Sequence, residues 1–369
     1  MYLGGNRLFT TRDGGISWHR TDDLTKNINR DSLEIMGVLG ADIKLTKNDG
    51  TSTFGEIISI SESPITKKEV WIGTDDGNVQ LTRDDGRTWA EVSQNILGLP
   101  QNAYVSRVLA SRQGRGHAYV TFDRHREGDW SPYVYKTEDF GKNWKSLSAD
   151  LPSGSINVIV EHPDNHDLLF IGTEHAVFVS LNSGIDWQKV TSNLPTTLYD
   201  DMIIHPREKD LILGTHGRSF WVLDDLAPLA EWNESKNKDV HLFSIRDATL
   251  FYYWKSTSYR SQEEWVGPNP EYGALINYVV NTDADSVTIT IKQRNQIVRQ
   301  YKEKSDKGKL KRLVWDLKYD TPTFSADAGD KEGLIKPKPE EILPKPPHPL
   351  RIQGVDVSPG TFDIVVSTC

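Results

Sequence analysis

Residues 82–89 read Thr-Arg-Asp-Asp-Gly-Arg-Thr-Trp, and this stretch decides the fold because the chain repeats its pattern. Each copy has Ser or Thr first, Asp or Asn third, Gly fifth and Trp eighth. In a tight β-turn of this kind, the Asp or Asn side chain bonds nearby backbone N–H groups, Gly takes a positive φ, and Trp packs beneath the hairpin. Two more regular copies lie at residues 11–18 and 137–144, and a less regular one lies at 180–187.

The intervals between these turns indicate a repeating unit. From Trp18 through Trp89 and Trp144 to Trp187 they shorten toward the ~40–45 residues of one four-stranded propeller blade. The same order recurs around the turns: an apolar strand, a second strand ending in Gly-Thr, a third strand, the turn, and a fourth strand that carries the Trp. We therefore predict an all-β chain with four to five blades in residues 1–230.

Both ends of the chain look cut within strands. Residues 1–6 match the middle of a blade, and residues 360–366 have a strand pattern that stops at Cys369. A propeller that lacks blades has open edges. We therefore expect a fragment, or a ring that another segment completes.

Composition excludes several classes of protein. The formal net charge is −9 over 369 residues, which argues against nucleic acid as a partner. No stretch approaches the ~20 apolar residues of a membrane span, so no transmembrane segment is predicted. The single cysteine excludes an internal disulfide framework and a thiolate zinc site.

The last third of the chain has a different character. Residues 231–271 are predicted to be a connecting segment, and residues 272–369 a small antiparallel β-sandwich. Alternating apolar and polar residues mark its predicted strands, which lie around residues 287–291, 297–301, 313–317 and 360–366.

Two polar segments interrupt this second domain. The Pro-rich insertion at residues 320–358 cannot form a regular ladder and favours extended conformations, so it is either a loop between strands or a docking peptide. The basic run at residues 302–312 contains acidic residues and a Gly, and it is predicted to be a solvated hairpin.

The repeated turn is the Asp-box. Together with residues 70–77, 134–144 and 214–224, it resembles the sortilin-type BNR/Asp-box β-propeller proteins of bacteria. Residues 288–292 and 312–316 are similar to the C-terminal Ig-like (FlgD-like) module of those proteins. The resemblance implies an exported protein, either secreted, periplasmic or at the cell surface. It names no activity, because such proteins are sometimes labelled glycosyl hydrolases on the repeat alone.

Blade topology separates structural from candidate functional residues. The Asp-box joins strands three and four, on the face opposite the turns between strands two and three, so its residues are interpreted as structural. They are Asp13, Gly15, Trp18, Asp84, Gly86, Trp89, Asp139, Gly141, Trp144, Asn182, Gly184 and Trp187.

The opposite face collects the predicted ligand-face residues. Charged groups with an exposed Trp suit a sugar, which needs polar partners and an aromatic surface, and they suit a peptide equally well. They are otherwise ordinary solvated turn residues. These candidates are Asp75, Asp76, Asp123, Arg124, Arg126, Trp130, Glu174, His175, Tyr199, His216 and Arg218.

No cofactor and no metal site are predicted. His162 and His166 are four residues apart, but Pro163 breaks any helix between them, and a second His-Pro pair at residues 205–206 marks a recurring blade turn. None of the usual hydrolase, zinc-protease or phosphate-loop motifs occurs.

Two functions remain open from the sequence. The first is a non-catalytic module that binds protein or carbohydrate at the propeller face. The second is a glycoside hydrolase, sialidase-like or xyloglucanase-like, which needs two carboxyl groups about 5 to 9.5 Å apart. The best guesses for that pair are Asp75 or Asp76 with Asp123 or Glu174, although no Arg-Ile-Pro motif of a sialidase precedes the turns.

Overall fold

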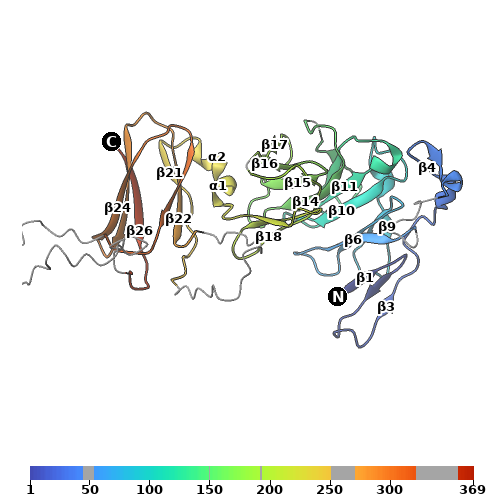
Figure 1. Cartoon of the computed structure of the whole chain (residues 1–369). Coiled ribbons are helices and arrows are strands. Elements are labelled where there is room, and N and C mark those ends of the chain that lie inside the picture. The colour runs from blue at the N-terminus through green and yellow to red at the C-terminus, as the bar shows by residue number, and fades with distance from the viewer. Residues whose placement is uncertain (45–53, 149, 192, 251–270, 321–355) are drawn as a thin grey trace, which may run out of the picture. The chain divides into compact units, whose positions relative to one another are not determined.

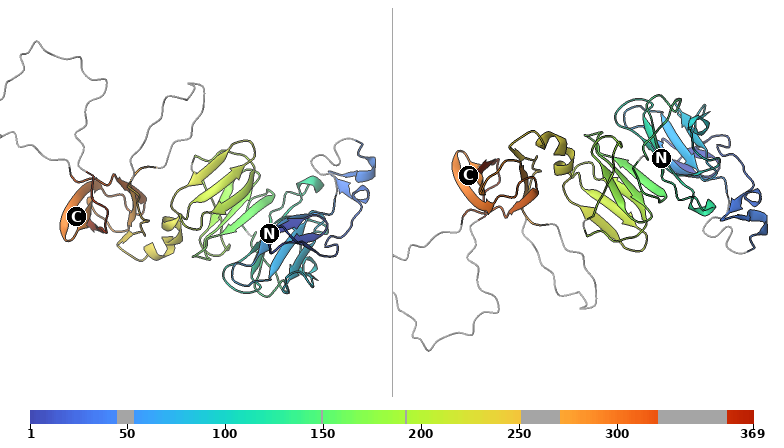
Figure 2. Two further views of the ribbon diagram at one scale, coloured as in Figure 1. Left: turned by 90° about the horizontal axis from the view of Figure 1, so that it is seen from below. Right: turned by 90° about the horizontal axis from the view of Figure 1, so that it is seen from above.

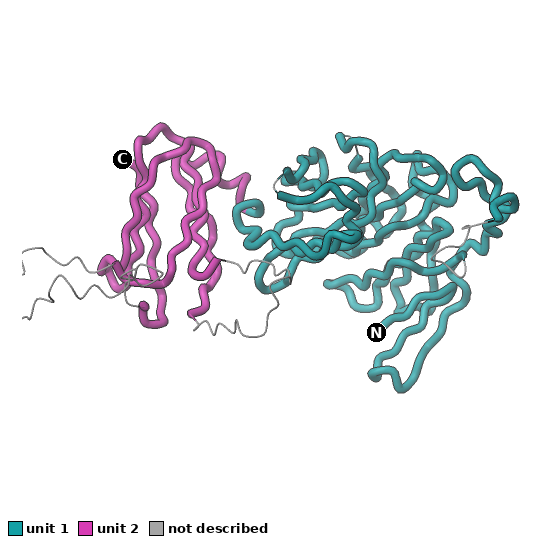
Figure 3. Tube along the Cα trace, in the orientation of Figure 1, with its two compact units in different colours: residues 1–230 teal, residues 231–369 magenta. Residues whose placement is uncertain are grey.

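The computed structural model describes residues 1–44, 54–148, 150–191, 193–250, 271–320 and 356–369. It divides the chain into two compact units, residues 1–230 and 231–369, which Figure 3 shows in two colours.

In its described residues, unit 1 has five small antiparallel sheets of three or four strands that follow one another in chain order (Figures 1 and 2), besides one two-stranded sheet in an insertion. In each of the five, every strand pairs with the next strand along the chain. We call these sheets blades A to E. Blade A has β1 (Tyr2–Gly4), β2 (Leu8–Thr10) and β3 (His19–Arg20); blade B has β6 (Ile57–Glu62), β7 (Val70–Thr74), β8 (Val79–Thr82) and β9 (Ala90–Glu91).

The later blades repeat this meander. Blade C has β10 (Tyr104–Ala110), β11 (Ala118–Asp123), β12 (Tyr133–Thr137) and β13 (Lys145–Ser146); blade D has β14 (Ile156–Glu161), β15 (Leu169–Thr173), β16 (Val177–Ser180) and β17 (Gln188–Lys189); blade E has β18 (Tyr199–Ile204), β19 (Leu211–Thr215) and β20 (Phe220–Leu223), followed by α1 (Ala227–Ala230).

The Asp-box turns close through their own side chains. In blade B, the Asp84 carboxylate accepts backbone N–H bonds from Arg87 and Thr88 at 3.0 and 2.9 Å. Gly86 has a φ of 84°, and the Trp89 indole donates to its carbonyl at 3.2 Å. The irregular fourth copy differs, because the Trp187 indole donates to Leu147 O instead, at 2.8 Å.

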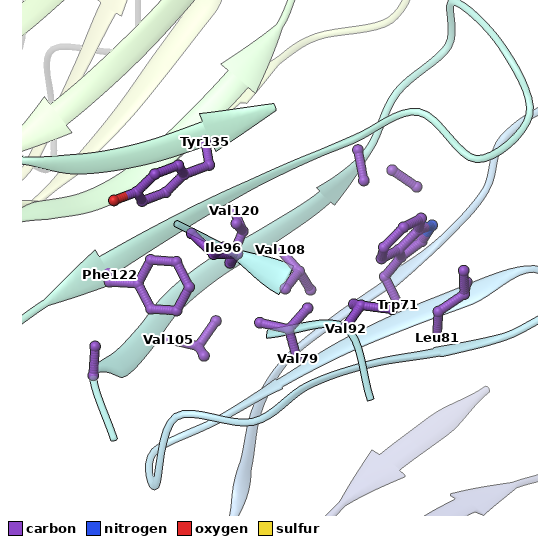
Figure 4. Close-up of a cluster of buried hydrophobic side chains, with 13 residues drawn as sticks. Trp71, Val79, Leu81, Val92, Ile96, Val105, Val108, Val120, Phe122 and Tyr135 are labelled. Atoms are coloured by element: carbon purple, nitrogen blue, oxygen red, sulfur yellow. The ribbon is translucent and has the colours of Figure 1, made fainter. Parts of the chain in front are cut away.

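Adjacent blades pack through apolar faces, and a small residue in the second strand allows the close approach. Figure 4 shows the cluster between blades B and C, where Trp71 and Val79 meet Val105, Val108 and Phe122. A Cβ added at Gly73 would lie 2.3 Å from Val105 Cγ1. The recurring Gly-Thr at the end of this strand is therefore a packing feature.

A polar insertion joins blades A and B. It contains η1 (Arg30–Ser32), β4 (Glu34–Ile35), β5 (Val38–Leu39) and η2 (Gly40–Asp42). The turn of its hairpin reaches blade C, where the Met36 N–H donates to the Arg126 carbonyl of η4 (His125–Glu127) at 2.7 Å.

In the part that the structure describes, unit 2 has two three-stranded antiparallel sheets. One is β21 (Val240–Leu242), β22 (Ala274–Val280) and β25 (Leu310–Trp315); the other is β24 (Gln296–Lys304), β23 (Ser286–Gln293) and β26 (Asp363–Thr368). Their facing apolar side chains, including Ile276, Ile289 and Trp315, form its core. The short helix α2 (Trp232–Ser235) precedes them. The Ig-like assignment of this unit stays a prediction.

Three predictions for this region compare with the structure as follows. The prediction of a solvated hairpin at residues 302–312 is wrong, because β24 and β25 belong to different sheets and do not pair with each other. The connecting segment 231–271 contributes a strand, since β21 pairs with β22. Most of the Pro-rich insertion, residues 321–355, lies outside the described residues. Among the helices that the structure does describe, none is long and apolar enough to cross a membrane.

Candidate functional site

The first strand of each of blades B to E carries a β-bulge near its start. The pairing register with the second strand shifts by one residue there, and the residues that it leaves unpaired are Ile58, Ser106, Asn157 and Asp200. Bulges re-aim side chains and are common next to binding sites.

Three of these bulge residues line one pocket of about 290 Å³ in unit 1. Its walls come from the starts of first strands, the connections between blades and the turns after second strands, so they belong to one face of the blades. The lining residues are Arg30, Leu33, Ile35, Phe54, Asp75, Asn102, Tyr104, Ser106, Asp123, His125, Arg126, Glu127, Asn157, Leu198 and Asp200.

The two acidic residues after β7 have different roles. Asp76 is fully buried, and its carboxylate accepts the Lys26 N–H at 2.6 Å, which anchors the insertion. Asp75 lines the pocket and accepts the N–H groups of Gly55 and Glu56 at 3.0 and 2.7 Å. Burial raises the pKa of Asp75, and the neighbouring charge of Asp76 adds to the rise.

A second acidic group lies where blades C and D meet. Asp123 ends β11, His125 follows in η4, and Glu174 follows β15. The His125 Nδ1 is 2.6 Å from Asp123 Oδ2 and 4.0 Å from Glu174 Oε1. Burial disfavours the charge on Asp123, but hydrogen bonds from His125 outweigh it and lower the pKa of Asp123. Burial, and then the charge of Asp123, raises the pKa of Glu174.

The two arginines of this loop face different partners. Arg124 is 3.1 Å from the Asp129 carboxylate, so it is used within the loop. Arg126 lines the pocket, and its guanidinium lies 5.8 Å from the centre of the Tyr104 ring. Glu127 lies beside it in the lining, and burial raises its pKa.

Trp130 and His175 extend this cluster outside the pocket lining. The Trp130 and His125 rings are 6.0 Å apart, and Trp130 is 41% exposed. His175 Nε2 is 3.8 Å from the Glu174 carboxylate. The sequence placed both residues with the ligand-face candidates, and the structure brings Trp130 next to His125 and His175 next to Glu174.

The candidates from blade E lie apart from the pocket lining. Tyr199 is buried in the core between blades D and E, and its hydroxyl donates to Pro195 O at 2.7 Å. His216 is exposed and lies 3.5 Å from Asp200, which does line the pocket. Arg218 is exposed in the same turn as His216.

Sequence reasoning placed Asp200 on this face, in the connector with Tyr199, but it missed the bulge residues Ser106 and Asn157 and the wall that the insertion supplies. A usable signal exists for the bulges, because Ser106, Asn157 and Asp200 are polar residues near the start of otherwise apolar strands. No comparable signal exists for Arg30, Leu33 and Ile35, since the long insertion carries no repeat from which to place them. His162 accepts N–H bonds from its own turn, as the recurring His-Pro pattern indicates.

Comparison with known proteins finds a family model that matches part of the chain. Residues 132–308, just under half of the chain, match the Sortilin-Vps10 family model, described as sortilin, neurotensin receptor 3. This match supports a sortilin-type β-propeller. The sequence-based resemblance and the all-β β-propeller fold are thereby confirmed for the sortilin-type part, and the matched segment runs from blade C into unit 2.

Individual relatives match only parts of this chain, and the chain spans only part of their length. The oligoxyloglucan-reducing end-specific xyloglucanase of Emericella nidulans is 27% identical over 32% of this chain and 14% of its own length. A GH74 enzyme of Niastella koreensis is 16% identical with a TM-score of 0.35, over 47% of this chain and 23% of that one. YCF48 of Cyanidioschyzon merolae is 19% identical with a TM-score of 0.32, over 46% and 56%.

Proposed function

We propose that unit 1 is a carbohydrate-binding module that works outside the cytoplasm, with the sugar in the bulge-lined pocket. One observation carries this proposal. The side-chain nitrogen of Asn157 is buried without a hydrogen-bond partner in the described part of the chain, and Asn157 lines the pocket. A buried donor without a partner costs about 1–3 kcal/mol, so a ligand oxygen at this position would recover that free energy.

The rest of the lining supports a polyhydroxyl ligand. Asp75 and Asp123 are acceptors for sugar hydroxyl groups, while Arg126 and Asn157 are donors. Tyr104 adds an aromatic ring on which the apolar face of a sugar can pack. A volume of about 290 Å³ is at the small end for ligand pockets and suits one or two sugar rings.

The class of sugar is proposed from the relatives. The curated relative that matches this chain is named as a xyloglucanase, so xyloglucan oligosaccharides are the first ligands to test. A peptide or protein partner was an equal alternative from the sequence. The donor and acceptor mixture in a small recess favours a sugar over a protein surface, which would need a larger contact area.

The test is isothermal titration with xyloglucan oligosaccharides. We expect wild-type chain to bind, and Asn157→Ala to bind at least tenfold more weakly. Gln188→Ala is the matched control, because this amide is exposed on β17 of the same blade. Thermal unfolding of both variants checks that they fold. Absence of binding, or equal binding by Asn157→Ala and wild type, would contradict the proposal.

A glycoside hydrolase is the second candidate, and Asp75 favours it. Its pKa is raised by burial, as expected for a general acid, and it shares the pocket with the Asp123 carboxylate. The test is release of reducing sugar from xyloglucan by wild type and by Asp75→Asn. Release that Asp75→Asn abolishes supports the hydrolase, whereas binding without release supports the binding module.

A further inference from the structure

One group of side chains, of which the carbohydrate proposal uses only Asp123, has an arrangement of its own beside the pocket. Asp123, His125 and Glu174 each place a ligand-type atom within 4.8 Å of those of the other two. Asp123 and His125 belong to blade C, and Glu174 belongs to blade D. The three side chains therefore meet because neighbouring blades align their turns after the second strand.

The electrostatics of this group favour a cation. The side chains of Asp123 and Glu174 are only 12% and 11% exposed, so two carboxylates are held out of water at one place. In the described part of the chain, the basic groups within ion-pair distance of them are the histidines His125 and His175. Buried carboxylates are normally paired with a cation or coordinate a metal.

A neighbouring hydroxyl gives a second, independent observation. Ser155 is fully buried, and its hydroxyl lies close enough to the Asp123 carboxylate to lower the pKa of Asp123, although the geometry of this contact falls short of a full hydrogen bond in the described residues. A buried hydroxyl that is only partly satisfied is costly. A water bound to a cation on Asp123 would give this hydroxyl a better-placed acceptor.

We propose that Asp123, His125 and Glu174 bind one divalent transition-metal cation, with Zn²⁺ and Mn²⁺ as the chemical class. The imidazole nitrogen favours Zn²⁺ over Ca²⁺ and Mg²⁺, which prefer oxygen ligands alone, and the two carboxylates also accept Mn²⁺. His125 binds through Nδ1, and any proton on that nitrogen leaves to solvent. Water completes the coordination on the exposed side of His125.

The site escaped sequence reasoning because its ligands come from two blades. The sequence predicts no metal, since Glu174 is far from Asp123 and His125 along the chain and no ligand spacing is visible. The inference does not rest on the carbohydrate proposal, because Glu174 is not part of the pocket lining. A metal on Asp123 would remove that carboxylate from a hydrolase role.

The test is titration of tag-free chain with Zn²⁺ by calorimetry and with Mn²⁺ by electron paramagnetic resonance. We expect one site per chain, and at least tenfold weaker binding by Glu174→Gln and by His125→Gln. His166→Gln is the matched control, because this exposed histidine lies 3.8 Å from Asp167 and should bind as wild type. No saturable single site, or unchanged binding by Glu174→Gln, would overturn the proposal.

A spectroscopic readout locates the metal and guards against misfolded variants. Because the Trp130 and His125 rings are 6.0 Å apart, bound Co²⁺ should quench Trp130 fluorescence. The quenched component should be missing from Trp130→Phe, which keeps all three ligands and should still bind one metal ion. Equal quenching in wild type and Trp130→Phe would place the metal elsewhere.

Discussion

The two faces of unit 1 place carboxylate side chains in opposite environments. On the Asp-box face, Asp13 is exposed and Asp84 and Asp139 are half-buried. Their carboxylates accept hydrogen bonds from their own turns, and their pKa values are lowered. On the pocket face, Asp75 and Glu174 are largely withdrawn from water, and burial raises their pKa values. A carboxylate that is satisfied within its own turn stabilises the fold, whereas one that is buried at a pocket is available for a ligand.

The largest expected effect, on thermal stability and on sugar binding together, comes from disturbing the packing between two blades. Gly73→Ala places a Cβ 2.3 Å from Val105 Cγ1, between blades B and C. Overpacking of this kind costs about 1–3 kcal/mol, and a backbone shift here would also move Asp75. We expect a lower unfolding temperature and weaker sugar binding together. A variant that loses neither would show that blade packing does not position the pocket.

The next largest effect is a loss of stability from a change on the Asp-box face alone. Thr82 is buried, and its Oγ1 accepts the Gly86 N–H at 2.9 Å and donates to Asp84 at 2.9 Å. Thr82→Val removes both bonds at nearly constant volume, so we expect a loss of about 1–3 kcal/mol in denaturant unfolding. Sugar binding should stay as in wild type. A large loss of affinity in the folded variant would break the separation of the two faces.

A smaller change in stability, and of the opposite sign, is expected from a substitution on the pocket face. The pKa of Asp75 is raised in the folded chain, so its ionised form is destabilised there, and stability associated with it increases as the pH falls. Asp75→Asn keeps an oxygen for the Gly55 and Glu56 N–H groups. At pH 7 we expect equal or slightly higher stability with weaker sugar binding. A clearly destabilised variant would show that Asp75 is a structural residue like Asp84.

The smallest expected effect is on the loss of folding stability at low pH. Hydrogen bonds, first from Thr88, lower the pKa of Asp84 to about 2, below its unfolded value near 3.9. A lowered folded pKa gives stability that is complete above the unfolded pKa and is lost as the pH falls toward about 2. Denaturant unfolding between pH 5 and pH 2 should therefore show a shallower decline for Asp84→Asn than for wild type. Parallel declines in the two proteins would show that the ionised Asp84 side chain does not stabilise the fold.

The fold was largely predictable because it repeats. The Asp-box turn is closed by side chains within its own eight residues, so it can be recognised from sequence alone. Its repeats located the strands around it, including the strands of blade E, which has no Asp-box. The packing of the Gly-Thr strand end was not predictable from one blade, since Gly73 matters only through Val105 of the next blade. The β24 and β25 strands were identified, but not their assignment to separate sheets.

The lining of the pocket was predictable only in part, for a physical reason. Asp75, Asp123 and Arg126 were expected on one face because turns after second strands share a face, and all three line the pocket. Asn157 was missed because its bulge is a property of strand pairing. The Tyr199 side chain turns into the core between blades D and E, because its place in the first strand faces the neighbouring blade.

The central claim is that ligand binding belongs to the pocket face. The most direct measurement is the nuclear magnetic resonance signal of the Asn157 side-chain amide during titration with a xyloglucan oligosaccharide. The Asn143 amide, which donates to Asp139 in an Asp-box at 2.6 Å, serves as the internal reference. We predict a saturable shift of the Asn157 signal while the Asn143 signal stays fixed. A shift of Asn143 without Asn157, or of neither signal, would contradict the account.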